Sequence, residues 1–293
     1  MTDRRRVGTG PLVIIGGHED KEGDRVILHE VARHLRGGRL VIATVASHQP
    51  DGYFAAYREA FTAIGVTDLV ELYVEERSET HDEEKLRLFD GAGGVFFSGG
   101  DQLRISSQLG DTPVEQRVRA IHEAGGVIAG TSAGASAMSD TMLVRGSSRE
   151  THRIGDLHLA PGLGFVRDVI IDQHFAERGR IGRLLGAVAQ NPRELGIGID
   201  EDTAIVLRTD RFSVIGSGGV YVVDGGGVTH SNIAEAEPHR ALSIHHVRLH
   251  VLGDGDGFDL LERRPAASGD VGAERPAEET AADRARHQDA AEL

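Results

Sequence analysis

Ser132 stands in a G-x-S-x-G pattern, Gly130-Thr131-Ser132-Ala133-Gly134, between an apolar run and a helical pattern. This is the sequence form of a nucleophile elbow, in which a sharp turn between a strand and a helix presents a serine above the edge of a sheet. Glycine and alanine suit such a turn because larger side chains would collide where the backbone segments approach each other. The pattern alone is common, but the strand before it and the helix after it favour a nucleophilic serine.

A serine nucleophile needs a base within hydrogen-bond reach, and the base usually needs an acid that orients it. Among the fifteen histidines we favour His174, because it follows an apolar run at 169–171 and should therefore lie at the same sheet edge as Ser132. The residues alone leave four candidates for the orienting acid, namely Asp172, Asp200, Glu201 and Asp202. If the acid is Glu201, the order Ser, His, Glu differs from the Ser, acid, His order of α/β-hydrolases.

The amides that stabilise an oxyanion can also be proposed from the sequence. The N–H group of Ala133 directly follows the serine, and the N–H group of Gly99 or Gly100 is the natural second donor, since glycine lets the backbone approach the reacting carbon. The alternative is that Gly99 and Gly100 form an ordinary tight turn. On the residues alone, the two interpretations are equally favoured.

Three arginines follow the proposed base. Arg178, Arg180 and Arg183 could bind a substrate carboxylate through paired hydrogen bonds, and in an acidic protein beside a serine site we weigh this equally with a solvated helix face. We expect no metal, since neither His245-His246 nor His18-Glu19-Asp20 has a convincing ligand spacing and the chain has no cysteine. No G-x-G-x-x-G pattern opens a helix after the first strand, so no nucleotide cofactor is expected.

The elements that must position these residues follow from periodicity. Strands are expected at 12–15, 40–45, 69–74, 95–97 and 127–129, alternating with helices at 24–36, 51–64, 79–89 and 113–124, the second capped by Asp51. This alternation predicts an α/β fold with a mostly parallel, doubly wound sheet. Sites in such sheets lie beyond the carboxyl ends of the strands, so the loops at 16–21 and 98–102 should converge on the serine turn.

The second half of the chain is less regular. Residues 139–165 are expected to be irregular, with strands at 169–171, 196–200 and 203–207 and a helix beginning near Arg178. The short glycine-separated strands between 212 and 252 predict an antiparallel extension of the same sheet. We divide the chain into a flexible lead-in (1–9), a single α/β domain (10–264) and a disordered acidic tail (265–293), whose few apolar residues cannot offset its ordering entropy.

Composition limits the function further. The formal net charge of −14 argues against nucleic-acid binding. No apolar segment is long enough to span a bilayer, and the apolar run near the start is too short for a signal peptide. We therefore expect no membrane association and a cytoplasmic location.

Five motifs in order give a resemblance to a known family. They are GGHEDK at 16–21, FFSGGDQLR at 96–104, GTSAGASAMS at 130–139, DQHFAERGRIGRL at 172–184 and GIGIDEDTAI at 196–205. Together, over about residues 10 to 250, they resemble the cyanophycinases, which belong to a serine peptidase family (S51) that also includes aspartyl dipeptidases. The resemblance implies a fold like that of class I glutamine amidotransferases (flavodoxin-like), with serine in place of their cysteine.

The resemblance also implies roles for residues of this chain. Ser132 would be the nucleophile, His174 the base and Glu201 the third member of the triad. The substrate pocket would be formed by Gln102, Asp172, Gln173, Arg178, Arg180 and Arg183. The substrate would be cyanophycin, a polyaspartate with arginine on each side-chain carboxyl group, released exolytically as β-aspartyl-arginine. The family implies a homodimer and no cofactor.

His18 departs from the pattern, since a smaller residue is expected there in many relatives. We expect it to narrow the edge of the pocket without contacting the triad.

Three alternative functions remain: a peptidase for short aspartyl or isoaspartyl peptides, a non-catalytic binding protein of the same fold, and an amidotransferase-like subunit. The amidotransferase-like subunit requires a cysteine at the elbow, where this chain has Ser132. The binding protein would be favoured by loss of a triad residue, and all three triad residues are present.

Overall fold

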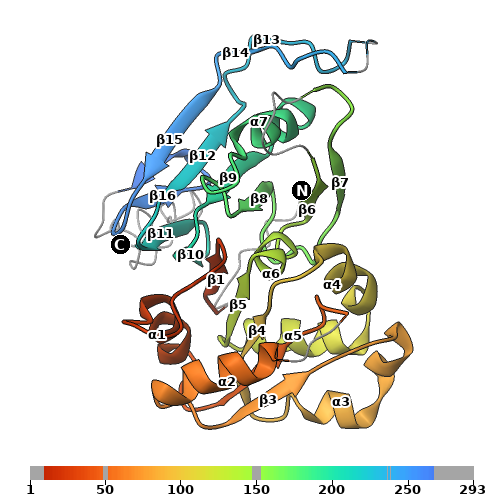
Figure 1. The fold of residues 1–293 in the computed structure, drawn as a ribbon, viewed down its shortest axis with the longest axis vertical. Coiled ribbons are helices and arrows are strands. Elements are labelled where there is room, and N and C mark those ends of the chain that lie inside the picture. The colour runs from red at the N-terminus through yellow and green to blue at the C-terminus, as the bar shows by residue number, and fades with distance from the viewer. Residues whose placement is uncertain (1–9, 49–51, 147–152, 236, 238, 267–293) are drawn as a thin grey trace, which may run out of the picture.

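A computed structural model describes residues 10–48, 52–146, 153–235, 237 and 239–266 of the chain (Figure 1). The predicted lead-in, the predicted cap Asp51 and most of the predicted tail lie outside the described residues. The predicted start of the tail was wrong by two residues, because Pro265 and Ala266 pair with Phe258 and Gly257 in an antiparallel ladder.

The five strands predicted before Ser132 are all present. They are β1 (Leu12–Ile15), β2 (Arg39–Ala43), β3 (Leu69–Leu72), β4 (Ala92–Phe97) and β5 (Val127–Thr131). They pair in parallel in the order β3-β2-β4-β5-β1. The sheet continues from β1 in antiparallel fashion through β10 (Thr203–Arg208), β11 (Arg211–Gly216), β16 (Gly257–Asp259) and β17 (Arg264–Ala266). Among the described residues it is therefore a nine-stranded mixed sheet.

The helices agree with the sequence patterns in part. They are α1 (Val26–Arg33), α2 (Tyr53–Ala63), the 3₁₀ helix η1 (Arg77–His81), α3 (Glu83–Arg87), α4 (Gln102–Leu109), α5 (Pro113–Glu123), α6 (Ala133–Ser136) and α7 (Ile181–Gln190). The single helix expected at 79–89 is instead η1 and α3, separated at Asp82. Helix α4 was not predicted, and the N-cap residue of α2 in the structure is Gly52.

The large sheet is buried on both faces by apolar side chains that alternate along its strands. Val13 and Ile15 pack with α1 and α2 in one core, while Leu12 and Ile14 pack with α5 and α6 in the other. Because side chains alternate between the faces of a strand, the continuous apolar runs of β1 and β2 supply both cores. Burying one such side chain contributes about 1.5–3 kcal/mol.

A second, four-stranded sheet was not expected. Its strands are β8 (Val169–Gln173), β9 (Leu195–Ile199), β12 (Val220–Asp224) and β15 (Arg248–Leu252), in the order β15-β12-β9-β8. The prediction that 212–252 extends a single sheet is wrong, since β11 joins the large sheet and β12 and β15 join the second. In Figure 1, β12 and β15 lie in the upper half of the view, and β3 and β4 in the lower half.

Part of the segment expected to be irregular also forms strands. There β6 (Thr141–Arg145) and β7 (His158–Pro161) pair as an antiparallel ribbon. Within 212–252, where short strands were expected, β13 (His230–Ser231) pairs with β14 (Ile244–His245). The fold is thus a mixed α/β fold with a large central sheet, and the finer class implied by the resemblance stays a prediction. No helix in the described part of the chain is long and apolar enough to cross a bilayer.

The glycine pair at the end of β1 joins the two sheets. Ser132 N–H, at the end of β5, donates to the carbonyl of Ile15 at 3.0 Å. His174 N–H, at the end of β8, donates to Gly16 O at 2.8 Å, and Asp202 N–H, in the turn after β9, donates to Gly17 O at 2.9 Å. The ends of three strands from two sheets therefore meet at residues 15–17.

Candidate active site

The turn that carries Ser132 has the strained geometry expected of an elbow. The φ and ψ angles of Ser132 are 54° and −112°, which are unusual for a residue with a side chain. The flanking glycines are required by space: a Cβ atom on Gly130 would lie 2.6 Å from the carbonyl carbon of Gly134, and one on Gly134 would lie 2.3 Å from the oxygen of Phe97. The small residues recognised in the sequence are therefore those that let the turn form.

His174 lies directly beyond β8, and its side chain points to the serine. Its Nε2 atom is 2.9 Å from Ser132 Oγ. The imidazole packs over Gly17, where a Cβ atom would come within 2.4 Å of His174 Cε1, so the second glycine of the pair makes room for the ring. The structure thus brings together the two residues that the sequence placed at one sheet edge.

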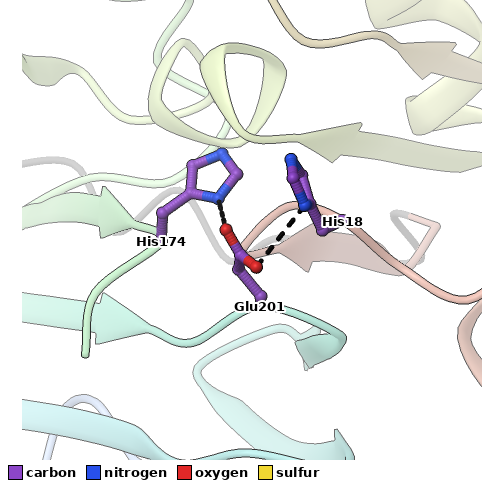
Figure 2. A group of neighbouring side chains, drawn as sticks. All are labelled: His18, His174 and Glu201. Atoms are coloured by element: carbon purple, nitrogen blue, oxygen red, sulfur yellow. Dashed lines mark hydrogen bonds and ion pairs between the residues drawn. The ribbon is translucent and has the colours of Figure 1, made fainter. Parts of the chain in front are cut away.

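Glu201 lies in the turn between β9 and β10 and contacts the other side of the imidazole. Its Oε1 atom is 2.6 Å from His174 Nδ1 (Figure 2). The other acids considered from the sequence have different partners: Asp200 accepts from Ala176 N–H at 2.9 Å, and Asp202 accepts from Asp20 N–H at 2.9 Å. Asp172 faces the arginines, as described below.

The surroundings of His174 favour its neutral form. Burial lowers the pKa of His174 below its ordinary value of 6.5, and the nearby charge of Arg178 lowers the pKa further. The hydrogen bond and charge of Glu201 act in the opposite direction but do not cancel the effect of burial. A neutral imidazole whose Nδ1 donates to Glu201 leaves Nε2 free to accept the proton of Ser132 near neutral pH.

Asp172 is buried beneath the pocket, and its carboxylate accepts hydrogen bonds from two arginines. Arg183 Nε donates to Asp172 Oδ2 at 2.7 Å and Arg183 Nη2 donates to Oδ1, while Arg180 Nη1 donates to Oδ1 at 3.1 Å. The carboxylate is 1% exposed and does not line the pocket. Asp172 is therefore placed to hold the arginines, not to face a ligand.

The three arginines differ in how far they are exposed to solvent. Arg180 and Arg183 are buried along most of their length but reach the pocket wall. Burial lowers the pKa of Arg180 to about 10, so the side chain remains charged at neutral pH, and its buried Nε has no hydrogen-bond partner among the described residues. Arg178, directly before them, is exposed at the rim of the pocket.

The two predicted amide side chains also lie on the pocket wall. Gln102 begins α4, and its Nε2 donates to the carbonyl of Leu143 at 2.8 Å. Gln173 Oε1 accepts from Arg180 Nη1 at 2.9 Å and lies 3.5 Å from Ser132 Oγ. Both amides are fixed by neighbouring groups, so the positions of their remaining polar atoms are set before any ligand enters.

Two of the three residues proposed for the oxyanion, Gly99 and Ala133, lie next to the serine, and the third, Gly100, lines the same pocket. A Cβ atom on Gly99 would lie 3.4 Å from Ser132 Cβ, which places this glycine against the nucleophile. Gly100 has a φ angle of +143° and approaches Ala46 so closely that a Cβ atom would lie 2.4 Å from Ala46 O. Ala133 is the first residue of α6. Its N–H is thus one of those that the helix leaves without an internal partner.

One pocket of about 630 Å³ is lined by nine of the predicted residues, namely Ser132, His174, Gly99, Gly100, Gln102, Gln173, Arg178, Arg180 and Arg183. Its wall also includes residues that the sequence reasoning missed. They are Glu19, Lys21, Tyr53, Ala56, Tyr57, Thr131 and Val144, together with Gly52. His18, which was expected at the edge of the pocket, also lines it. Glu19 and Lys21 belong to the GGHEDK motif, so the motif was the available signal, but we interpreted them only as part of a polar loop.

Glu19 is the centre of a buried polar network beside the nucleophile. It is 3% exposed, and its carboxylate accepts from Tyr57 Oη at 2.5 Å and from Thr131 Oγ1 at 2.6 Å. Lys21 Nζ lies 2.9 Å from Glu19 Oε1 and 4.8 Å from the centroid of the Tyr57 ring. Burial and the charge of Glu19 hold the pKa of Tyr57 well above its usual value, so its hydroxyl stays a donor.

The expectation that His18 would not contact the triad was wrong, since its ring contacts the histidine–glutamate pair. His18 Nδ1 lies 3.4 Å from Glu201 Oε2, and its ring meets that of His174 edge-on with 5.1 Å between centroids (Figure 2). His18 has a φ angle of 49°, a left-handed conformation. The turn after the two glycines therefore directs this side chain back over the site, which the spacing of residues in the sequence does not reveal.

Comparison with known proteins identifies the family of this chain. The model of peptidase family S51 matches residues 12–215. A cyanophycinase of Synechococcus elongatus is 39% identical over 255 residues, covering 86% of this chain and 79% of that protein. A cyanophycinase of Geminocystis herdmanii (strain PCC 6308) is 38% identical over 260 residues, covering 87% of this chain and 96% of that protein.

Among solved structures, a peptidase from an acI-B1 Actinobacterium has a similar fold. The TM-score is 0.64 at 22% identity, and the match covers 86% of this chain and 97% of that one. At this identity the likeness shows the fold alone. The chain belongs to peptidase family S51, a family of serine peptidases.

Proposed function

We propose that this protein is a cyanophycin-degrading serine exopeptidase in which Ser132, His174 and Glu201 form the catalytic triad. The observation that carries the proposal is the continuous chain of hydrogen bonds from Ser132 Oγ through His174 to Glu201, with heavy-atom distances of 2.9 and 2.6 Å. Relatives called cyanophycinase, at 38–39% identity over most of the chain, support the choice of substrate.

The reaction would proceed through an acyl-enzyme. Ser132 Oγ attacks the carbonyl carbon of an aspartyl backbone amide while His174 Nε2 takes the hydroxyl proton, and Glu201 stabilises the imidazolium through Nδ1–H. The N–H groups of Ala133 and of Gly99 or Gly100 stabilise the oxyanion. His174 then returns the proton to the leaving amine, and a water molecule activated by the same histidine hydrolyses the ester. No cofactor takes part.

The charge of the pocket supports a ligand that carries several carboxylates. Lys21, Arg178, Arg180 and Arg183 line the pocket, and the one carboxylate on its wall among the described residues, apart from the triad, is the fully engaged Glu19. Cyanophycin has a carboxylate on each side-chain arginine and another at its carboxyl end. We propose that the arginines, with Gln102 and Gln173, bind these groups while Asp172 fixes Arg180 and Arg183 from behind.

The product of digestion tests the proposal. Purified protein incubated with insoluble cyanophycin should release β-aspartyl-arginine, detected by mass spectrometry, and no longer fragments at early times. Polyaspartate without arginine is the matched control and should remain intact. Release of long fragments would contradict exolytic cleavage, and absence of any release would contradict the polymer as substrate.

Short isoaspartyl peptides are the second candidate substrate, because the family resemblance also covers aspartyl dipeptidases. Turnover of these peptides with no turnover of cyanophycin would favour this candidate.

The resemblance also leads us to propose a homodimer in the cytoplasm. Light scattering on the purified protein would measure the first, and fractionation of the source cells the second.

A further inference from the structure

We propose that His18, His174 and Glu201 form a Zn²⁺ site, and that an ion bound there switches the enzyme off. Two imidazoles and a carboxylate are ligands that Zn²⁺ takes in proteins, with water as a fourth. One ligand atom from each of the three residues lies within 4.8 Å of the others. Figure 2 shows His18 and His174 on the two sides of the Glu201 carboxylate, each with a ring nitrogen directed to one of its oxygens.

The three ligands can reach an ion by small rotations. Two ligand atoms of a tetrahedral zinc site are about 3.3 Å apart, as follows from bonds of about 2.0 Å. The separation between His18 Nδ1 and Glu201 Oε2 is already 3.4 Å, whereas that between His174 Nδ1 and Glu201 Oε1 must open from 2.6 Å. The side chain of His18 is 71% exposed and that of Glu201 is 28% exposed, so these two are free to adjust around the buried His174.

This site could not be recognised in the sequence because its ligands come from three separate turns. His18 follows β1, His174 follows β8 and Glu201 follows β9. The hydrogen bonds made by Gly16 and Gly17 bring these turns together. His18 is the residue that converts the histidine–glutamate pair into a three-ligand cluster, and it is also the departure noted in the GGHEDK motif.

Binding of the ion would remove the base at either ring nitrogen of His174. An ion on Nε2 occupies the atom that accepts the Ser132 proton. An ion on Nδ1 requires the other tautomer of the neutral ring, in which its single N–H proton has moved from Nδ1 to Nε2, and Nε2 then donates to Ser132 Oγ instead of accepting from it. This inhibitory consequence rests on the proposed function, but the binding of the ion does not.

The test measures binding and inhibition separately. A Ser132→Ala variant keeps all three ligands, and we expect titration calorimetry to show a Zn²⁺ site on it, with Co²⁺ giving the visible absorption of a tetrahedral ion. Adding His18→Asn should weaken this site about tenfold or more. Asparagine suits the comparison because it tolerates the left-handed backbone of residue 18. His29→Asn, in α1, is the control for loss of any histidine.

Inhibition by Zn²⁺ is then measured for each variant as a fraction of that variant's own rate without metal, and these fractions are compared between variants. The unsubstituted protein and His29→Asn should lose activity in micromolar Zn²⁺ and regain it with a chelator, and His18→Asn should need at least tenfold more. Equal binding in the presence and absence of His18, or no site on Ser132→Ala, would overturn the proposal. Protein that hydrolyses no substrate would contradict the proposed function, while the calorimetry would still decide the metal site.

Discussion

The two sides of the pocket are held in place by different forces. On the side of the elbow, Ser132 is positioned by shape: glycines at 130 and 134 allow backbone segments to approach, and the serine N–H is tied to Ile15. On the side of the arginines, position depends on charge, since the buried Asp172 carboxylate binds Arg180 and Arg183.

The two sides therefore tolerate different substitutions. A closely packed turn responds to the volume of a side chain, whereas a buried ion cluster responds to the removal of one charge, because the remaining charges are left without compensation. The nucleophile requires one fixed geometry, and packing supplies it. The arginines must remain charged and oriented while partly out of water, and only a counter-charge behind them can do this.

The largest effect on stability is expected for Asp172→Asn. The variant keeps the volume of the side chain but leaves two buried guanidinium groups facing a neutral amide. We expect the free energy of unfolding to fall by about 3–5 kcal/mol, the range for breaking a buried pair. Denaturant unfolding measures the change, and a loss below about 1 kcal/mol would mean that charge does not hold this side together.

A smaller loss is expected for Gly134→Ala, which tests the side held by shape. The added methyl group would overlap the carbonyl oxygen of Phe97, so the turn must shift, at a cost of about 2 kcal/mol or more. Gly253→Ala is the matched control, because no atom lies within 4 Å of a Cβ atom at that position. Equal stability of the two variants would show that the turn is not closely packed.

Arg178→Ala should change substrate binding without a change in stability. The side chain is exposed at the pocket rim, so we expect KM to rise about tenfold, equivalent to about 1.4 kcal/mol, while the free energy of unfolding stays within about 0.5 kcal/mol. Arg193→Ala removes another exposed arginine, whose nearest acidic partner is Asp168 at 3.6 Å, and should leave KM unchanged. An equal KM for both variants would remove Arg178 from the binding site.

The smallest effect concerns pH. Burial lowers the pKa of His174 below 6.5, so the imidazole becomes protonated only at a pH lower than this. As the pH decreases, kcat/KM should therefore fall with a midpoint below 6.5. Glu201→Gln removes a group that raises this pKa, so the midpoint should move to still lower pH, with a greatly reduced rate. A midpoint above 6.5 in the unsubstituted protein would contradict the buried environment of the base.

The same contrast explains what the sequence could predict. The elbow was predictable because it is local: a strand, a turn of small residues and a helix follow one another within about fifteen residues. The five parallel strands were predictable for the same reason. Helix α4 was missed, although Asp101 accepts from Leu103 N–H as an N-cap should, because Ser106 and Ser107 interrupt its apolar spacing.

Non-local contacts were not predictable. The crossing from β9 in one sheet to β10 in the other depends on strand pairing between distant residues, and no periodicity within 195–208 reveals it. The arginines were noticed, but their partner Asp172 was interpreted as a ligand contact because its burial could not be seen. His18 was expected to avoid the triad, since its left-handed backbone is not apparent from its residue type.

The account depends most directly on Ser132 as the nucleophile. The measurement is the mass of the intact protein after rapid acid quenching during cyanophycin digestion, with Ser132→Ala and the neighbouring Ser136→Ala in parallel. We expect a covalent substrate fragment on the unsubstituted protein and on Ser136→Ala, and neither fragment nor dipeptide from Ser132→Ala. Dipeptide release by a correctly folded Ser132→Ala variant would contradict it.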